Sequence, residues 1–280
     1  MTEPVATPDS AAPAPTGHAG MTRERATLTH FILSITVFVI VVVPLLFLWY
    51  PPPLFFADGG WNVIKIAYSV DIGIGPLMTL VVFKSGKKGL KFDLGVIATL
   101  QIAALLWGVH LMYQERPVLL VFADDRFTTV TMNQLAASKR PLDELLKLGN
   151  ERPVRVLVKL PQDPTESLKI KMAQLQEGTS IIRLTERYEG MTPENLKYVY
   201  DQSLDMDAFI AKRPQNREPY ETFLQDNKLD PKDLAFVPLI CRYDNVIIAL
   251  RRSDSSIAGT LNITPPDYNL FSKSHKTGAK

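Results

Sequence analysis

The chain has 280 residues, which is long enough for a membrane part and one soluble domain. Its formal net charge of +2 lacks the strongly basic character that nucleic-acid binding requires. The single cysteine, Cys241, cannot form an internal disulfide, so it leaves the redox compartment open. Its apolar surroundings predict a small core residue rather than a nucleophile.

The chain begins with a stretch rich in Pro, Ala, Ser and Thr that has no apolar periodicity. We predict that residues 1–27 form a disordered tail. Met21 stands directly before a short basic lead, TRERATLTHF. Two hypotheses stay open, namely that Met21 is the true start or that the tail is an ordinary disordered N-terminus.

Three apolar segments follow within residues 28–116, and each is close to the ~20 residues that cross a bilayer as a helix. They are Leu28–Tyr50, Asn62–Phe83 and Leu94–Tyr113. We therefore predict an α-helical membrane protein with three transmembrane helices. The first segment is too long for the core of a signal peptide and has no small-residue cleavage site at its end.

The distribution of lysine and arginine predicts the topology, because basic residues mark the cytoplasmic side. Arg23 and Arg25 precede the first segment, and the loop Lys84–Lys91 contains four lysines. The loop Pro51–Trp61 has no lysine or arginine. We expect a cytoplasmic N-terminus and place everything after Arg116 in the periplasm of a bacterial inner-membrane protein. The lysines would alternatively bind anionic lipid headgroups.

We predict that residues 117–265 form one periplasmic α+β domain and that residues 266–280 form a polar C-terminal tail. Runs of β-branched and aromatic residues, several of them alternating with polar residues, indicate strands; they are Val118–Ala123, Phe127–Thr131, Val154–Leu160, Phe236–Arg242, Asn245–Arg251 and Ile257–Ile263. Helix patterns and start signals occupy Leu135–Leu148, Asp163–Glu177, Pro193–Ala211 and Arg217–Asn227. We expect the first of these helices to restart at Pro141, and the last three strands to form a meander.

The middle apolar segment carries residues that are costly in a membrane helix, namely Asp71, Gly75 and Pro76. A carboxylate in hydrocarbon costs roughly 2.5–3.5 kcal/mol on insertion scales. Pro76 also frees the carbonyl of Ile72, which another group must satisfy. We therefore expect this segment to be surrounded by other protein.

Helix geometry indicates which polar residues meet at the same depth. At about 1.5 Å per residue, Asp71 lies about 10 Å from the outer helix end, Trp107 about 9 Å and His110 about 5 Å. We predict that Trp107, or failing that His110, donates a hydrogen bond to Asp71. Gln101 lies level with Pro76 and is placed to serve the backbone there. Alternatives remain: an internal pair that only fixes the bundle, a partner contact, or a proton pathway.

The usual catalytic signatures are absent from the sequence. It contains no phosphate loop after a strand, no GxSxG and no HExxH. The four histidines do not cluster at ligand spacing. We therefore expect no enzymatic activity, no metal, no cofactor and no small-molecule substrate.

A series of motifs in fixed order resembles the type IV pilin accessory proteins of the TfpX/TfpZ type. The motifs are WYPPPLF, DGGW, VDIGIGPLMTLVVF, KKGLKFDLGVI, LQIAALLWG and YQERPVLLVF. The resemblance is strong from Leu28 to about Thr131 and loose thereafter. The family pattern falls on Tyr50, Pro51, Leu54, Phe55, Gly59, Gly60, Asp71, Gly75, Pro76, Lys91, Asp93, Gln101, Arg116 and Pro117.

The resemblance implies an inner-membrane, chaperone-like protein that assists the stability of a pilin and its assembly into type IV pili. The implied partner is a major pilin, which waits in the membrane on one apolar helix with its head outside; membrane lipid is the other contact. The alternative hypothesis is a membrane-bound enzyme that modifies pilin, such as a glycosyltransferase. The sequence leaves open which pilin is served, at which step, and in which oligomeric state.

Overall fold

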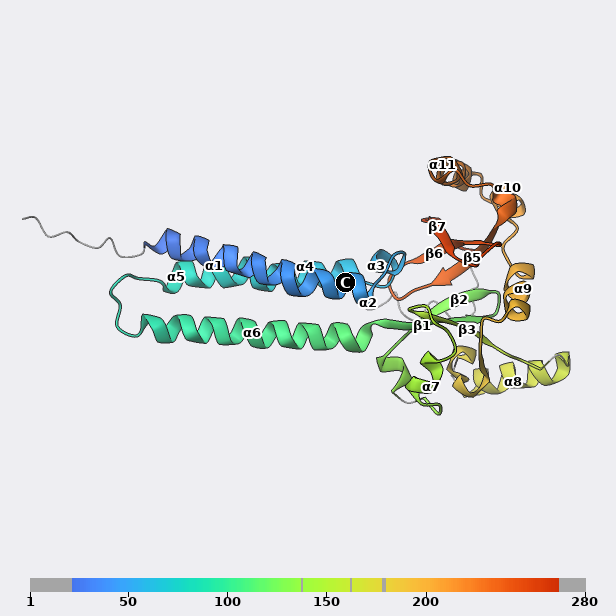
Figure 1. Cartoon of the computed structure of the whole chain (residues 1–280), viewed down its shortest axis with the longest axis horizontal. Coiled ribbons are helices and arrows are strands. Elements are labelled where there is room, and N and C mark those ends of the chain that lie inside the picture. The colour runs from blue at the N-terminus through green and yellow to red at the C-terminus, as the bar shows by residue number, and fades with distance from the viewer. Residues whose placement is uncertain (1–21, 137, 162, 178–179, 267–280) are drawn as a thin grey trace, which may run out of the picture.

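A computed structural model gives the fold of residues 22–136, 138–161, 163–177 and 180–266. The predicted tails therefore lie largely outside the described residues. Helices on one side form an elongated helical stalk (residues 22–116), and a sheet with its covering helices forms the sheet domain (residues 117–266) at one end of it (Figure 1).

The helical stalk consists of three helical stretches. The first two are interrupted by π-helical turns, and the third is a regular α-helix. In chain order they are α1 (Arg23–Val37), η1 (Phe38–Val42) and α2 (Val43–Trp49); α4 (Gly60–Ala67), η2 (Tyr68–Ile74) and α5 (Gly75–Val82); and α6 (Leu90–Glu115). A single turn, α3 (Leu54–Ala57), lies between the first two stretches.

Each π-helical turn lies just before a proline. Pro44 follows η1, and Pro76 follows η2. A proline ring clashes with the carbonyl four residues earlier and offers no N–H to it. The wider π turn accommodates that ring, so both helices continue past their prolines instead of ending there.

Within the described residues, two stretches are long and apolar enough to cross a membrane, Arg23–Trp49 and Leu90–Glu115. The expected middle span is helical from Gly60 to Val82, but only its portion Ile72–Val82 counts as an apolar helix, and that is short for a span. The structure thus supports two of the three predicted spans by length and composition.

The sheet domain is built on one mixed seven-stranded sheet, so the predicted α+β domain is confirmed. The strand order is β4-β3-β1-β2-β5-β6-β7. In chain order the strands are β1 (Pro117–Ala123), β2 (Arg126–Thr131), β3 (Val154–Val158), β4 (Tyr188–Gly190), β5 (Leu234–Ile240), β6 (Asn245–Arg251) and β7 (Ile257–Leu261). β3 runs parallel to β1 and β5 parallel to β2, whereas β5, β6 and β7 form the predicted antiparallel meander.

One face of the sheet, here called the outer face, is covered by helices in two groups. Side chains such as Val121 and Val156 pack with Leu145 of α7 (Leu142–Leu146). At the other end of the sheet, Phe236 and Ile247 pack under α10 (Met206–Lys212) and α11 (Arg217–Asn227).

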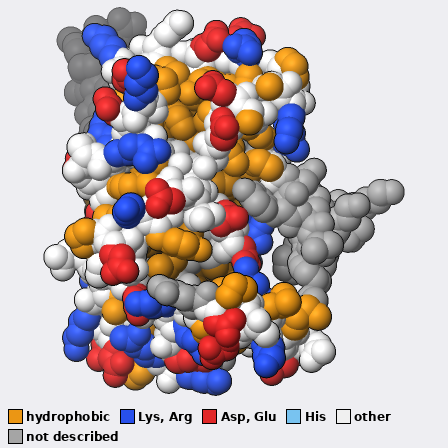
Figure 2. Space-filling model, turned by 90° about the vertical axis from the view of Figure 1, so that its right-hand side faces the viewer, with side chains coloured by type: hydrophobic (Ala, Val, Ile, Leu, Met, Phe, Trp, Pro, Cys, Tyr) orange, Lys and Arg blue, Asp and Glu red, His pale blue; other side chains and the backbone are white. Residues whose placement is uncertain are grey.

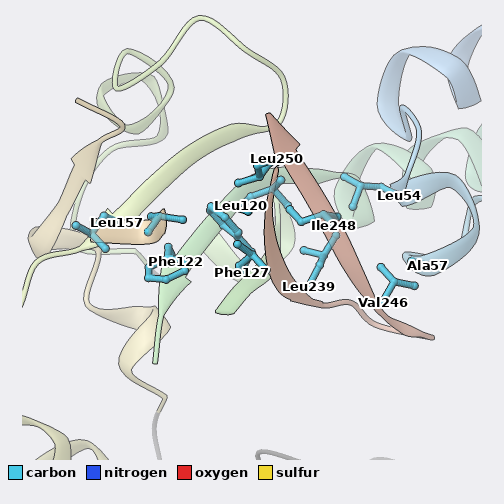
Figure 3. Close-up of a cluster of buried hydrophobic side chains, with 13 residues drawn as sticks. Leu54, Ala57, Leu120, Phe122, Phe127, Leu157, Leu239, Val246, Ile248 and Leu250 are labelled. Carbon is cyan, nitrogen blue, oxygen red and sulfur yellow. The ribbon is translucent and has the colours of Figure 1, made fainter. Parts of the chain in front are cut away.

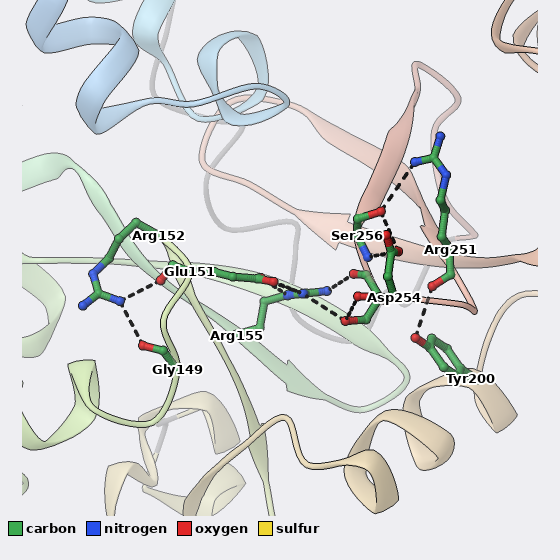
Figure 4. Close-up of polar contacts among 9 residues, drawn as sticks. Gly149, Glu151, Arg152, Arg155, Tyr200, Arg251, Asp254 and Ser256 are labelled. Atoms are coloured by element: carbon green, nitrogen blue, oxygen red, sulfur yellow. Dashed lines mark hydrogen bonds and ion pairs between the residues drawn. The ribbon is translucent and has the colours of Figure 1, made fainter.

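The opposite face, here called the inner face, holds the core cluster around Phe122 and Phe127, whose rings meet edge to face at 5.1 Å. The sheet curls around this face. Arg155 of β3 donates to the carbonyl oxygen of Ser255 in the β6–β7 turn at 2.5 Å, although β1, β2 and β5 separate β3 from β6. Figure 4 shows this bridge, with Glu151 on the other side of the Arg155 guanidinium at 2.6 Å. α9 (Pro193–Asp201) covers one end of the curled face through Val199.

Three details of the predicted helices need correction. Leu135–Leu148 is only a short 3₁₀ turn and α7, which begins after Pro141 as expected. Pro193–Ala211 is two helices, α9 and α10, because the Asp205 carboxylate accepts the Ala208 N–H and starts a new helix. The helix predicted at Asp163–Glu177 does form, as α8 (Pro164–Gln176). Its amphipathic pattern suggested a buried face, but none of its described residues is buried.

Candidate functional site

The loop Pro51–Gly59, here called the docking loop, connects the first two helical stretches of the stalk and enters the core of the sheet domain. Leu54 and Ala57 are 1% and 2% exposed and belong to the cluster on the inner face of the sheet. Figure 3 shows both residues beside Val246, Leu239 and Ile248. The sheet domain therefore completes its core with residues that precede it by about sixty positions in the chain.

Asp58 fastens the docking loop by hydrogen bonds to two separate parts of the sheet domain. Its Oδ1 accepts from the Thr129 hydroxyl at 2.9 Å and from the Arg242 backbone N–H at 3.0 Å. Oδ2 is buried and has no hydrogen-bond partner among the described residues. Loss of solvent raises the pKa of the Asp58 carboxyl, and the hydrogen bonds from Arg242 and Thr129 oppose this rise.

The two glycines after Asp58 are required by close contacts. Gly59 has φ +102°, and the ring of Tyr243 lies where a Cβ would point. A Cβ on Gly60 would lie 2.8 Å from the Phe55 carbonyl oxygen. The Tyr243 and Asp244 backbone N–H groups both donate to the Ala57 carbonyl at 3.1 Å. The GG pair thus permits the β5–β6 turn to lie directly on the docking loop.

The end of α6 forms a second connection between the stalk and the sheet domain. Glu115 pairs with the Arg242 guanidinium at 2.6 Å, although the two residues are 127 positions apart in the sequence. The Arg116 guanidinium stacks on the Tyr113 ring at 3.6 Å, and Pro117 begins β1 as a buried residue. Tyr50 is buried nearby, and its hydroxyl lies 3.5 Å from the Met112 carbonyl oxygen.

A polar cluster joins all three helical stretches of the stalk. His30 Nδ1 lies 2.5 Å from the Thr79 hydroxyl, and His30 Nε2 lies 2.7 Å from Gln101 Oε1. The Gln101 amide sits against Gly75, where any Cβ would overlap it. Gln101 thus lies beside Gly75 and the buried Pro76, at the level expected, and its partner there is an imidazole.

The other predicted membrane residues lie apart from this cluster. Trp107 is 65% exposed and His110 is exposed beside it, with ring centroids 5.9 Å apart. The side chain of Asp71 lies outside the described residues, so its predicted pairing with Trp107 or His110 stays a prediction. At the far end of the stalk, Lys91 is exposed and Asp93 pairs with Lys87 at 2.6 Å.

A small cavity and the thiol of Cys241 lie near these contacts. A cavity of about 80 Å³ lies between the prolines Pro51–Pro53 and the paired Arg155 and Glu151. Among the described residues no group of three His, Cys, Asp or Glu side chains could hold a metal ion. Cys241 is half-buried against the inner cluster, and burial, with the charge of Asp58, raises the pKa of its thiol.

The described part of the sheet-domain surface that faces away from the stalk carries charges of both signs. Seen from the end away from the stalk, basic, acidic and apolar side chains are interspersed (Figure 2). Its large exposed apolar residues in the described ranges are few, namely Leu168, Met172, Tyr198 and Tyr243. The described side chains of this face therefore form no single-sign patch of the kind that steers a charged partner.

Sequence reasoning missed His30, Thr79, Asp58 and Arg242 as site residues. In the sequence, His30 is one of four histidines that do not cluster, and Asp58 is one letter of the motif DGGW. The signal available for Asp58 was its position between a short apolar run, LFFA, and a glycine pair. Its partners are 71 and 184 positions away, so no local pattern could have named them.

Together these features define a class of protein: an apolar helical stalk fastened by a docking loop to a mixed α+β domain. Over 217 residues the chain is 30% identical to the fimbrial assembly protein of serogroup I of Dichelobacter nodosus, a match that covers 75% of this chain and 83% of that protein. The serogroup E1 protein is 28% identical, again over 75% of this chain and 83% of that protein. The protein of serogroups C1 and C2 is 29% identical over 40% of this chain and 87% of its own length.

The chain therefore belongs to this family of fimbrial assembly proteins. No family model and no solved structure matches it. The predicted role in pilus assembly is thereby confirmed in its general form.

Proposed function

We propose that this protein is an inner-membrane assembly factor for type IV pili, of the TfpX/TfpZ type, that binds a pilin and stabilises it before assembly. The names of the relatives support the assembly role. The observation that carries the proposal is the docking loop. Because Leu54 and Ala57 are core residues of the sheet domain, the loop fixes that domain directly on the end of the stalk.

The proposed topology has three spans, with the N-terminus in the cytoplasm and the sheet domain in the periplasm. The 26 residues of α6 extend about 39 Å, enough for a hydrocarbon core of about 30 Å. The lysine loop lies at the end of the stalk away from the sheet domain (Figure 1). Trp49 and Tyr113 stack edge to face at 5.5 Å at the other end, where interfacial aromatic residues are expected.

A pilin with one apolar helix and an outer head would contact this protein twice. α6 buries only Ile97 and Met112, so most of its apolar surface is open to lipid or to a partner helix. The sheet domain lies on the side where the pilin head would be. A rigid connection lets the first contact raise the effective concentration for the second, which increases avidity without a larger interface.

Co-purification tests the proposed partner. The tagged full-length chain, extracted in mild detergent from cells with and without pilin, should retain pilin. Deletion of the gene should lower the steady-state level of pilin in the membrane. Pilin that neither co-purifies nor changes in level would contradict the proposal.

Reporter fusions test the proposed topology. Alkaline phosphatase fused after Lys280 should be active, and the same enzyme inserted near Lys88 should be inactive. The opposite pattern would place the sheet domain in the cytoplasm and overturn the arrangement.

The proposal includes the absence of enzymatic activity, and intact-mass measurement of pilin tests it. Pilin from cells with and without this protein should have the same mass. A mass difference that corresponds to a sugar or another group would favour the pilin-modifying enzyme instead.

A further inference from the structure

Asp58 lies where the stalk and the sheet domain meet, and it is unusual among the described residues. Its side chain is 4% exposed in the intact chain, and Oδ2 is the one buried side-chain polar atom in the described ranges without a hydrogen-bond partner. An ionised carboxylate in this position accepts two hydrogen bonds on Oδ1, but its Oδ2 accepts none from the described residues. Burial of a charge is costly unless it is fully paired.

The surroundings do not neutralise this carboxylate by direct pairing. The Arg242 side chain points its Nη1 at Glu115 at 2.6 Å, so only its backbone N–H reaches Asp58. The titratable groups near Asp58 on the neighbouring elements are Tyr50, Glu115, Cys241, Arg242, Tyr243 and Asp244. Of these, the Glu115 carboxylate raises the pKa of Asp58, and the Arg242 guanidinium lowers it.

We propose that Asp58 makes the docking loop a proton-controlled latch, which holds the stalk and the sheet domain together more firmly when the carboxyl carries a proton. Undocking returns Asp58 to water, where ionisation costs nothing extra. The latch joins the two parts of the molecule, so its opening frees the sheet domain to move on the end of the stalk. This device acts whichever partner the protein has.

The direction of the pH effect follows from linkage. Desolvation raises the pKa of docked Asp58 above the ordinary 3.8 that it has when undocked. The docked form therefore binds the proton more tightly, so docking is strongest in acid and weakens as pH rises through the docked pKa. Between the undocked and the docked pKa of Asp58, the docking equilibrium constant falls by up to about tenfold per pH unit. Above the docked pKa the constant no longer changes with pH.

Amide hydrogen exchange of the full-length protein in detergent micelles tests the latch. The Tyr243 and Asp244 amides donate to Ala57 only while the loop is docked, so their protection reports docking. From about pH 4 to about pH 8, protection corrected for the intrinsic exchange rate should fall in the native protein. It should be independent of pH in Asp58→Asn, which cannot ionise.

Two further variants make the test specific. Asp244→Asn removes an exposed neighbouring carboxylate and should keep the native pH response. Thr129→Val removes a hydrogen bond that favours the charged form of Asp58, so it should move the fall in protection to higher pH. This variant also serves if Asp58→Asn cannot be purified.

The results that overturn the latch are equally defined. The latch is wrong if protection in the native chain does not change with pH, or if Asp58→Asn keeps the native pH response. It is also wrong if Asp244→Asn loses that response. In Thr129→Val, a fall in protection at the native pH or at lower pH would overturn it as well.

Discussion

Truncating Leu54 tests whether the sheet domain needs the docking loop for its core. Leu54 is 1% exposed and packs on the inner face of the sheet beside Ile248 and Leu239. Leu54→Ala removes three buried carbons, a methine and two methyls, and leaves a cavity, which costs about 2–5 kcal/mol for Leu→Ala in protein cores. That is a large part of a typical stability of about 5–15 kcal/mol.

The assay is thermal unfolding of the full-length protein in detergent, followed by near-ultraviolet circular dichroism. At about 2–4 °C per kcal/mol for a domain of this size, Leu54→Ala should lower Tm by about 4–20 °C. Phe56→Ala is the matched control, because Phe56 lies two positions away on the same turn and is 72% exposed. It should change stability by about 0.5 kcal/mol or less.

A second control keeps the volume of the side chain. Leu54→Met preserves the apolar contact and should cost less than about 1.5 kcal/mol. If Leu54→Ala and Phe56→Ala shift Tm equally little, the docking loop does not complete the core, and the argument that it fixes the two parts together fails.

Three more predictions concern single positions. Gly75→Ala should destabilise the stalk by about 1–3 kcal/mol in thermal unfolding, because its Cβ overlaps the Gln101 amide, whereas Gly73→Ala, with open space around it, should be neutral or slightly stabilising; equal effects would contradict the packing. Arg155→Met should loosen the curled sheet and increase hydrogen exchange in β3 and the β6–β7 turn, since the guanidinium bridges Glu151 and Ser255; unchanged exchange would show that the bridge is dispensable. Cys241 should react slowly with a bulky maleimide at neutral pH in the folded protein and rapidly after unfolding, because burial raises the pKa of its thiol; rapid labelling of intact membranes would refute this.

Local patterns predicted most of the strands because their cause is local. Alternation and β-branched runs located β1, β2, β3 and the meander of β5 to β7 within a few residues. β4 was missed, since it has only the three residues Tyr188–Gly190 and is held by pairing with β3 rather than by its own propensity. The Asp205 cap divided one predicted helix into two, a detail that apolar periodicity alone overlooks.

The polar residues of the stalk show where such reasoning stops. Counting residues along straight helices placed Gln101 level with Pro76, because depth depends only on helical rise. The structure puts its amide against Gly75, the residue before Pro76. The same count could not reveal His30 as its partner, since rotation about the helix axes depends on how three helices pack. The π turns before Pro44 and Pro76 also alter that rotation, and a count at constant helical rise does not include them.

The sequence by itself determined the apolar segments, the asymmetry of the lysines, the α+β character of the second part and the resemblance to proteins of pilus assembly. Each of these depends on composition or on spacing along the chain. Only the tertiary structure decided that Leu54 and Asp58, which precede the sheet domain, belong to its core and its attachment. The physical reason is that a curled sheet leaves an open inner face, and the segment that covers it is chosen by packing in space rather than by order in the chain.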